Sequence, residues 1–149
     1  MTKEELIKSL SELWLAKRFL EAMENEQKVI HELYDPTLKL FGSPPLWPKN
    51  FTDQTFLQIE VELVLMDATV NLARERIASA ERLVRDLALY IKVGDLYRRL
   101  EQTPPLFKGK TISDEFERSL NDAKAAFEEV PLLRAEFNYH VTSIKSLLP

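Results

Sequence analysis

The stretch IEVELVLMDATVNLARERIASAERLVRDLALYI, residues 59–91, decides the fold of this chain. Its apolar and small residues recur in unbroken steps of four and three. They are Ile59, Leu63, Met66, Val70, Ala73, Ile77, Ala80, Val84, Leu87 and Ile91. This spacing places all of them on one stripe of an α-helix, in the heptad pattern of helices that pack side by side. The sequence therefore predicts a long middle helix with a continuous buried seam.

A strand is the competing interpretation for the beginning of this stretch. The segment QIEVELVL, residues 58–65, alternates apolar and polar residues and is rich in β-branched side chains, as strands are. A strand needs a neighbour to pair with, and the chain offers no second segment of this kind. The helical spacing also continues far beyond residue 65. We therefore expect a helix here.

An N-terminal helix precedes the middle one. Thr2 and Glu5 have the spacing of a capping box, in which each side chain bonds to a free amide of the first turn. A helix of about 30 residues should follow and end near Tyr34. Its expected buried positions are Leu6, Leu10, Leu13, Ala16, Leu20, Met23, Ile30 and Tyr34.

The C-terminal third of the chain predicts another helical stripe. Arg134 fills the slot between Val130 and Phe137 in this pattern, and Pro131 lies inside it. Because proline lacks an amide hydrogen and its ring clashes with the preceding turn, the helix should kink or divide into segments near 113–129 and 131–147. The expected buried positions are Phe116, Leu120, Ala123, Phe127, Val130, Phe137, Val141, Ile144 and Leu148.

Two connecting segments resemble each other. SPPLWPKNFTD, residues 43–53, is echoed by TPPLFKGKTISD, residues 103–114. The match extends over residues 33–56 and 93–116, which predicts an internal repeat of about 60 residues. Each copy should end a long helix, form a short helix capped by aspartate, and turn through Pro-Pro-Leu-aromatic into the next long helix. The expected caps are Asp35 and Asp95 for the short helices and Asp53 and Ser113 for the long ones, with Gly42 and Gly94 as helix ends.

These patterns predict an all-α fold, an elongated antiparallel bundle of three long helices that forms a single domain over residues 1–149. The formal net charge of −4 disfavours a dedicated nucleic-acid binder, which needs a basic surface. The absence of cysteine excludes disulfides and thiolate chemistry. No signal-peptide or membrane-spanning pattern is evident, so we expect a soluble, cytoplasmic protein.

Two groups of apolar residues are candidates for protein interaction. Trp47, Phe51 and Phe107 lie in the corners, where they either cover the ends of the bundle or bind a partner. A second group lies on the middle helix beside the seam and gives it more apolar width than one neighbouring helix covers. It comprises Leu57, Val61 and Leu65, followed by Ala68 and Leu72. This surplus predicts self-association, most simply as a homodimer.

The segment RAEFNYH, residues 134–140, offers a catalytic alternative. Its arginine and histidine, with five residues between them, resemble the Arg-x(4–6)-His motif of HEPN-domain ribonucleases, which are small helical domains. The resemblance implies that His140 would serve in acid–base chemistry and Arg134 would hold a phosphate, in a metal-independent site formed by two chains. The position after the arginine is Ala135, where that family often has a polar residue. The structural alternative is an arginine whose stem packs on the core.

Other chemistry has little support in the sequence. Glu136 and His140 share a helix face but make only two ligands, and no glycine-rich phosphate loop is present. We therefore expect no cofactor and no metal. The leading interpretation is a non-enzymatic helical interaction or assembly protein, a scaffold or adaptor that acts through protein–protein contacts. The alternative is an RNA-directed helical domain, a HEPN-like ribonuclease or a simple RNA binder.

Overall fold

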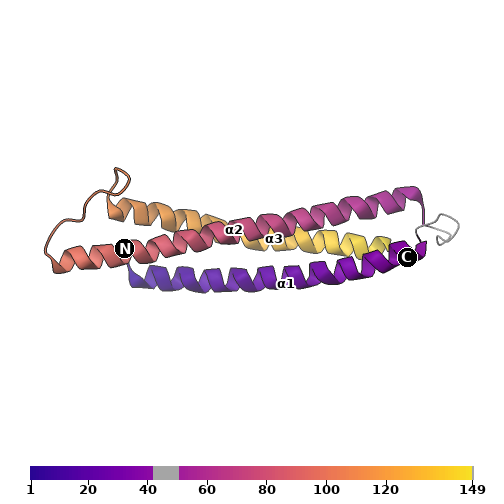
Figure 1. The fold of residues 1–149 in the computed structure, drawn as a ribbon, viewed down its shortest axis with the longest axis horizontal. Coiled ribbons are helices and arrows are strands. Elements are labelled where there is room, and N and C mark those ends of the chain that lie inside the picture. The colour runs from indigo at the N-terminus through magenta and orange to yellow at the C-terminus, as the bar shows by residue number, and fades with distance from the viewer. Residues whose placement is uncertain (42–50, 149) are drawn as a thin grey trace. The chain divides into compact units, whose positions relative to one another are not determined.

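The computed structural model describes residues 1–41 and 51–148. Three helices account for nearly all of them: α1 (Lys3–Phe41), α2 (Asp53–Arg99) and α3 (Ile112–Leu147) (Figure 1). The described residues contain no strand beyond an isolated bridge between Phe107 and Lys110. The all-α prediction is confirmed, and the strand alternative for residues 58–65 is wrong because this segment lies within α2.

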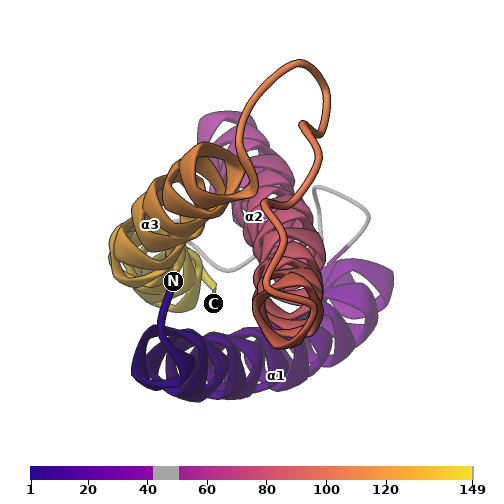
Figure 2. The same cartoon turned by 90° about the vertical axis from the view of Figure 1, so that its left-hand side faces the viewer.

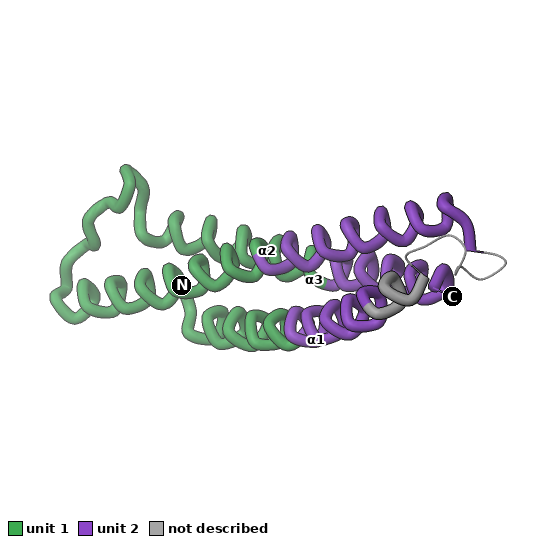
Figure 3. The backbone as a smooth tube through the Cα atoms, turned by 45° about the vertical axis from the view of Figure 1, so that its right-hand side comes forward, with its two compact units in different colours: residues 1–18, 75–130 green, residues 19–74, 131–149 purple. Residues whose placement is uncertain are grey.

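The chain forms two compact units, coloured separately in Figure 3. Unit 1 comprises residues 1–18 and 75–130, and unit 2 comprises residues 19–74 and 131–149. Each unit contains a segment of all three helices. In unit 1, the part nearest the viewer in Figure 2, these segments are arranged around a common centre.

Polar contacts within unit 2 define the directions of its helices. Between α1 and α2 the contacts are Glu24–Arg74 and His31–Asp67. The residue numbers rise along α1 as they fall along α2, so these helices are antiparallel. Between α1 and α3 the residue numbers rise together, from the Phe19–Arg134 ring contact to the Glu26–Lys145 ion pair, so these helices are parallel. The antiparallel three-helix bundle predicted from the stripes is confirmed within the unit.

The core of each unit is built from the predicted seams. All ten residues of the α2 seam are buried. In unit 2 the seam packs with Met23, Ile30 and Tyr34 of α1 and with Phe137, Val141 and Ile144 of α3. In unit 1 a second cluster unites Leu87, Tyr90 and Ile91 of α2 with Ile112, Phe116 and Leu120 of α3.

Two predicted core positions are wrong. Leu10 is exposed and Ser9 is buried in its place, because Ser9 continues the seven-residue spacing of Ala16, Met23 and Ile30. The heptad register therefore outweighs the hydrophobicity of a single residue.

Arg134 is exposed, and Leu133 is buried in its place. Leu133 belongs to a row of α3 in which Ile112, Ser119, Leu133 and His140 are all buried. A helix packed against two neighbours buries a wider stripe than a two-helix seam does, and this wider stripe includes the additional row.

Several predicted breaks are absent. Asp35 lies inside α1 and Asp95 inside α2, so neither caps a separate short helix, and Gly94 does not end α2. Pro131 lies within α3, which continues through it and does not divide into two helices. Buried side chains on both sides of the proline, Val130 and Leu133, hold the two turns against the core and offset its local cost.

The predicted N-terminal cap is correct for α1 and wrong for α2 and α3. The capping box at α1 is confirmed: the Thr2 amide donates to Glu5 Oε2 and the Glu5 amide to Thr2 Oγ1, both at 3.2 Å. Asp53 and Ser113 do not cap α2 and α3. Threonines do so instead, because Thr52 Oγ1 accepts from the Thr55 amide and Thr111 Oγ1 from the Asp114 amide. A cap must stand before the first helical residue, and both predicted residues lie inside the helices.

The internal repeat stays a prediction. Gly42, Trp47 and the first Pro-Pro-Leu segment lie outside the described residues. The second corner is an irregular segment in which Glu101 and Lys108 have positive φ angles.

Candidate functional site

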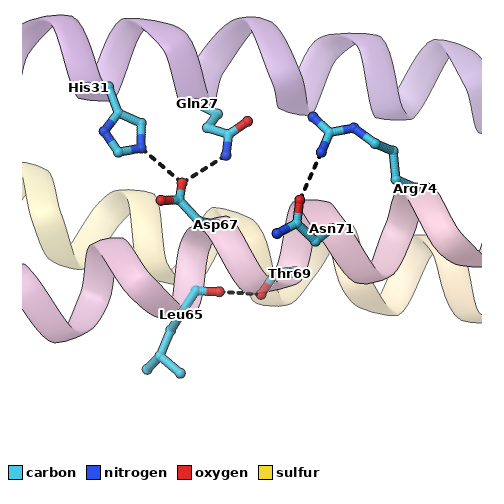
Figure 4. A network of polar contacts seen from close by, with 7 residues as sticks. All are labelled: Gln27, His31, Leu65, Asp67, Thr69, Asn71 and Arg74. Atoms are coloured by element: carbon cyan, nitrogen blue, oxygen red, sulfur yellow. Dashed lines mark hydrogen bonds and ion pairs between the residues drawn. The ribbon is translucent and has the colours of Figure 1, made fainter.

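The surface of α2 opposite its buried seam carries a run of exposed apolar residues. We call this group the α2 stripe; it comprises Leu57, Val61, Val64, Leu65 and Ala68, and its four large residues are 43–65% exposed. Successive helical residues are 100° apart, so Val61 and the buried Leu63 lie on opposite faces. Figure 4 shows Leu65 directed away from α1, whereas Asp67 of the same helix is directed toward it. The predicted candidates Leu57, Val61 and Leu65 therefore form one surface.

Charged residues are absent from this stripe. From Asp53 to Ala73 the charged residues are Asp53, Glu60, Glu62 and Asp67, and no lysine, arginine or histidine occurs. Three of the four acids interact with other helices: Glu60 accepts from the Tyr34 hydroxyl, Glu62 bonds to His140, and Asp67 bonds to Gln27 and His31. The stripe is thus an uncharged apolar surface on an acidic segment.

A shallow groove of about 420 Å³ borders the stripe within unit 2. Leu57, Val61 and Glu62 line it from α2, and Ser143, Ser146 and Leu147 line it from α3. The groove widens the surface on which a partner side chain could pack. Its lining is mixed, with apolar residues next to two hydroxyls and a carboxylate.

Polar contacts with the neighbouring helices fix the orientation of α2 in unit 2. Asp67 Oδ1 accepts from Gln27 Nε2 at 2.7 Å and lies 2.9 Å from His31 Nε2 (Figure 4). Arg74 donates to Asn71 of its own helix and to Glu24 of α1. These bonds lie on the side of α2 that faces α1. The apolar stripe is therefore turned outward by both the core and the polar contacts.

The catalytic alternative, Arg134 with His140, is not assembled within the chain. Arg134 places its guanidinium 4.6 Å from the centre of the Phe19 ring, which is a cation–π contact on α1. His140 is only 6% exposed, and its Nδ1 lies 2.6 Å from Glu62 Oε2 of α2. Six residues apart on a helix, the two side chains point in different directions. Their contacts hold α3 against two different helices.

The His140 ring has one unused nitrogen. Nδ1 makes the hydrogen bond to Glu62 Oε2. Nε2 is buried and has no hydrogen-bond partner among the described residues. A base that must exchange protons with a substrate needs an accessible atom, and this nitrogen is enclosed.

The aromatic corner residues differ in their surroundings. Phe51 is half-buried and packs against the core of unit 2, as the structural interpretation expects. Phe107 is partly exposed, with its ring 5.9 Å from that of Tyr90, and the neighbouring Leu106 is exposed. Trp47 lies outside the described residues.

Sequence reasoning missed a second exposed apolar surface, on the first turns of α1 in unit 1. We call it the α1 stripe; it comprises Ile7, Leu10, Ser11, Trp14 and Leu15, and Trp14 is 62% exposed. The guanidinium of Arg18 lies 5.4 Å from the centre of the Trp14 ring. The helical spacing of Ile7, Leu10 and Trp14 could have revealed this stripe, but assigning Leu10 to the core concealed it.

Other kinds of site find no support in the part of the chain that the structure describes. No cluster of three or more histidine, aspartate or glutamate side chains there could hold a metal ion. Within the same residues, no helix has a stretch long and apolar enough to cross a bilayer. Comparisons with protein-family models, with curated proteins and with solved structures found no match to this chain.

Proposed function

We propose that this chain is a non-enzymatic helical assembly protein, a scaffold or adaptor that acts through protein–protein contacts. The observation that carries the proposal is the α2 stripe, an uncharged apolar helix face opposite the core. Single exposed apolar residues are ordinary on protein surfaces, but a contiguous row of them marks an interaction site. Burying the stripe against another chain removes this surface from water, which favours association.

The physical basis of the contact is helix packing. Leu57, Val61 and Val64 recur at four and three residues, the spacing at which one helix presents side chains to the grooves of another. The contact should be of modest strength, because a standard protein interface uses roughly 20–30 residues on each side and this stripe supplies five. Self-association, with a homodimer as its simplest form, is the expected result.

Light scattering coupled to size exclusion tests this proposal. The wild-type chain should show a mass above that of one chain at micromolar concentration, and Leu65→Glu should return it to one chain while the helical circular dichroism is unchanged. Ala78→Glu is the matched control, because it adds the same charge to an exposed position of α2 outside the stripe. A wild-type mass of one chain at every concentration would overturn self-association.

A second measurement separates assembly from the RNA-directed alternative. Incubation of the purified protein with single-stranded RNA, without added metal, should leave the RNA intact. Cleavage that His140→Ala abolishes, with helicity retained, would replace the assembly proposal with the nuclease.

A further inference from the structure

The two exposed stripes differ in the charge that surrounds them. The segment Lys3–Arg18, which carries the α1 stripe, contains four lysines and arginines and three glutamates, a net charge of +1. The segment from Asp53 to Ala73, which carries the α2 stripe, contains four acids and no basic residue, a net charge of −4. The two stripes are alike in apolar character, and the segments that carry them differ in net charge, +1 against −4.

The charges lie close to the stripes. On α1, Lys3, Lys8 and Arg18 lie on the outward half of the helix together with Glu4, all of them exposed. On α2, Asp53 is exposed one turn before Leu57, and Glu62 lines the groove beside Leu57 and Val61. A helix laid on either stripe would come within reach of these side chains.

We propose that the α1 stripe of one copy of this chain docks on the α2 stripe of a second copy. This inference rests on the proposed assembly function and names its partner. The contact pairs two apolar rows of similar length and brings basic residues beside acidic ones, which favours this pairing over others. Trp14 is the expected anchor, because exposed tryptophan is enriched among the residues that contribute most to interfaces.

Pairing of like stripes is less favourable on both counts. Two α2 stripes would bring together two segments that contain acids and no basic residue, and the repulsion between their exposed carboxylates extends over a screening length of about 8 Å at physiological salt. Such a contact would also leave the α1 stripe, with Trp14, in water. One unlike contact covers the α1 stripe of one copy and the α2 stripe of the other, and the two stripes that remain exposed can bind further copies or close a ring.

Complementation between two variants tests the pairing. Trp14→Glu blocks the α1 stripe and leaves the α2 stripe intact, and Val61→Glu does the reverse. Both positions are exposed, so both variants should keep the wild-type helical circular dichroism. If Trp14→Glu fails to fold, Ile7→Glu takes its place, because Ile7 is exposed on the same stripe.

The measurement is sedimentation velocity of each variant alone and of their equimolar mixture, beside the wild type. Each variant alone should be a single chain, and the mixture should form a complex of two chains. A variant that self-associates as strongly as the wild type, or a mixture that stays monomeric while the wild type assembles, overturns the pairing but leaves assembly intact. A monomeric wild type overturns both.

Salt provides a second readout with opposite signs for the two models. If unlike stripes pair, the dissociation constant should rise several-fold between about 0.05 M and about 0.5 M sodium chloride, because screening weakens the attraction. If two acidic stripes pair, association should strengthen over the same range. Strengthening would therefore overturn the proposal.

Discussion

At the residue scale, the position of a side chain on its helix matters more than its identity. Leu57 and Leu63 are both leucines on α2 and lie six residues apart, yet Leu57 is 61% exposed and Leu63 is 5% exposed. The same contrast explains why Ser9 is buried and Leu10 is not. A residue at a buried position of the seven-residue register is buried even when it is polar, provided that the core has room for its side chain.

Truncating these two leucines should separate their roles. Leu63→Ala removes buried methyl groups and leaves a cavity, so it should lower the free energy of unfolding by about 2–5 kcal/mol. Leu57→Ala should change it by only about 0.5 kcal/mol in either direction. Urea denaturation of both variants at a concentration where the chain is monomeric is the measurement. Equal losses would show that the α2 stripe is part of the core.

At the scale of the element, each long helix tolerates residues that would break a shorter one. Asp35–Pro36 lies within α1, Gly94 within α2 and Pro131 within α3. Local propensity assigned a boundary to each of these positions. Each boundary is absent because a long helix is stabilised mainly by its packed face, which outweighs one unfavourable residue.

Replacing Pro131 should show this local cost. Pro131 is exposed, so Pro131→Ala removes no core contact and restores an amide donor inside α3. The helix should gain up to about 3 kcal/mol, less the roughly 0.4–1 kcal/mol by which alanine favours the unfolded chain. Thermal and urea unfolding should both show stabilisation. A lower midpoint would indicate that the proline is required by the local geometry of α3.

At the scale of the whole molecule, two units each have a core of their own and use all three helices. Interhelical charge pairs supplement these cores. In unit 1 Lys17 of α1 lies 2.8 Å from Glu81 of α2, and Arg76 of α2 lies 2.8 Å from Glu129 of α3. In unit 2 Arg74 pairs with Glu24 and Lys145 with Glu26.

The free energy of unfolding should fall in acid, because two carboxyls of unit 1 have lowered pKa values in the folded state. The hydrogen bond from Lys17 lowers the pKa of Glu81, and the hydrogen bond from Arg118 lowers the pKa of Glu115. A carboxyl with a lowered folded-state pKa stabilises the fold above its unfolded-state pKa, and the contribution is lost as pH falls through the folded-state value. The free energy of unfolding should therefore decline as pH falls below about 4.5, the ordinary pKa of a glutamate carboxyl.

Chemical denaturation at a series of pH values checks this, with Glu81→Gln as the comparison. The variant should lose less stability than the wild type on acidification, because it has no carboxyl to protonate at this position. Identical pH profiles for the two chains would contradict the assigned role of Glu81.

The sequence by itself determined the helical class, the α2 seam and the cap at Thr2. These features depend on contacts within a few turns, so the spacing of residues along one helix specifies them. The α2 stripe could also be predicted, because Leu57, Val61 and Leu65 exceed what the seam requires. Its exposure could not, since it depends on where α1 and α3 pack.

The tertiary structure decided which of two possible stripes each helix buries and where each helix ends. Burial of Leu133 and His140, with exposure of Arg134, follows from α3 packing against two helices in unit 2. The bond between His140 and Glu62 joins residues 78 positions apart, which no local pattern can specify. Local spacing defines a helix and its candidate faces, but the energy that selects one face comes from burying it against neighbours distant in sequence.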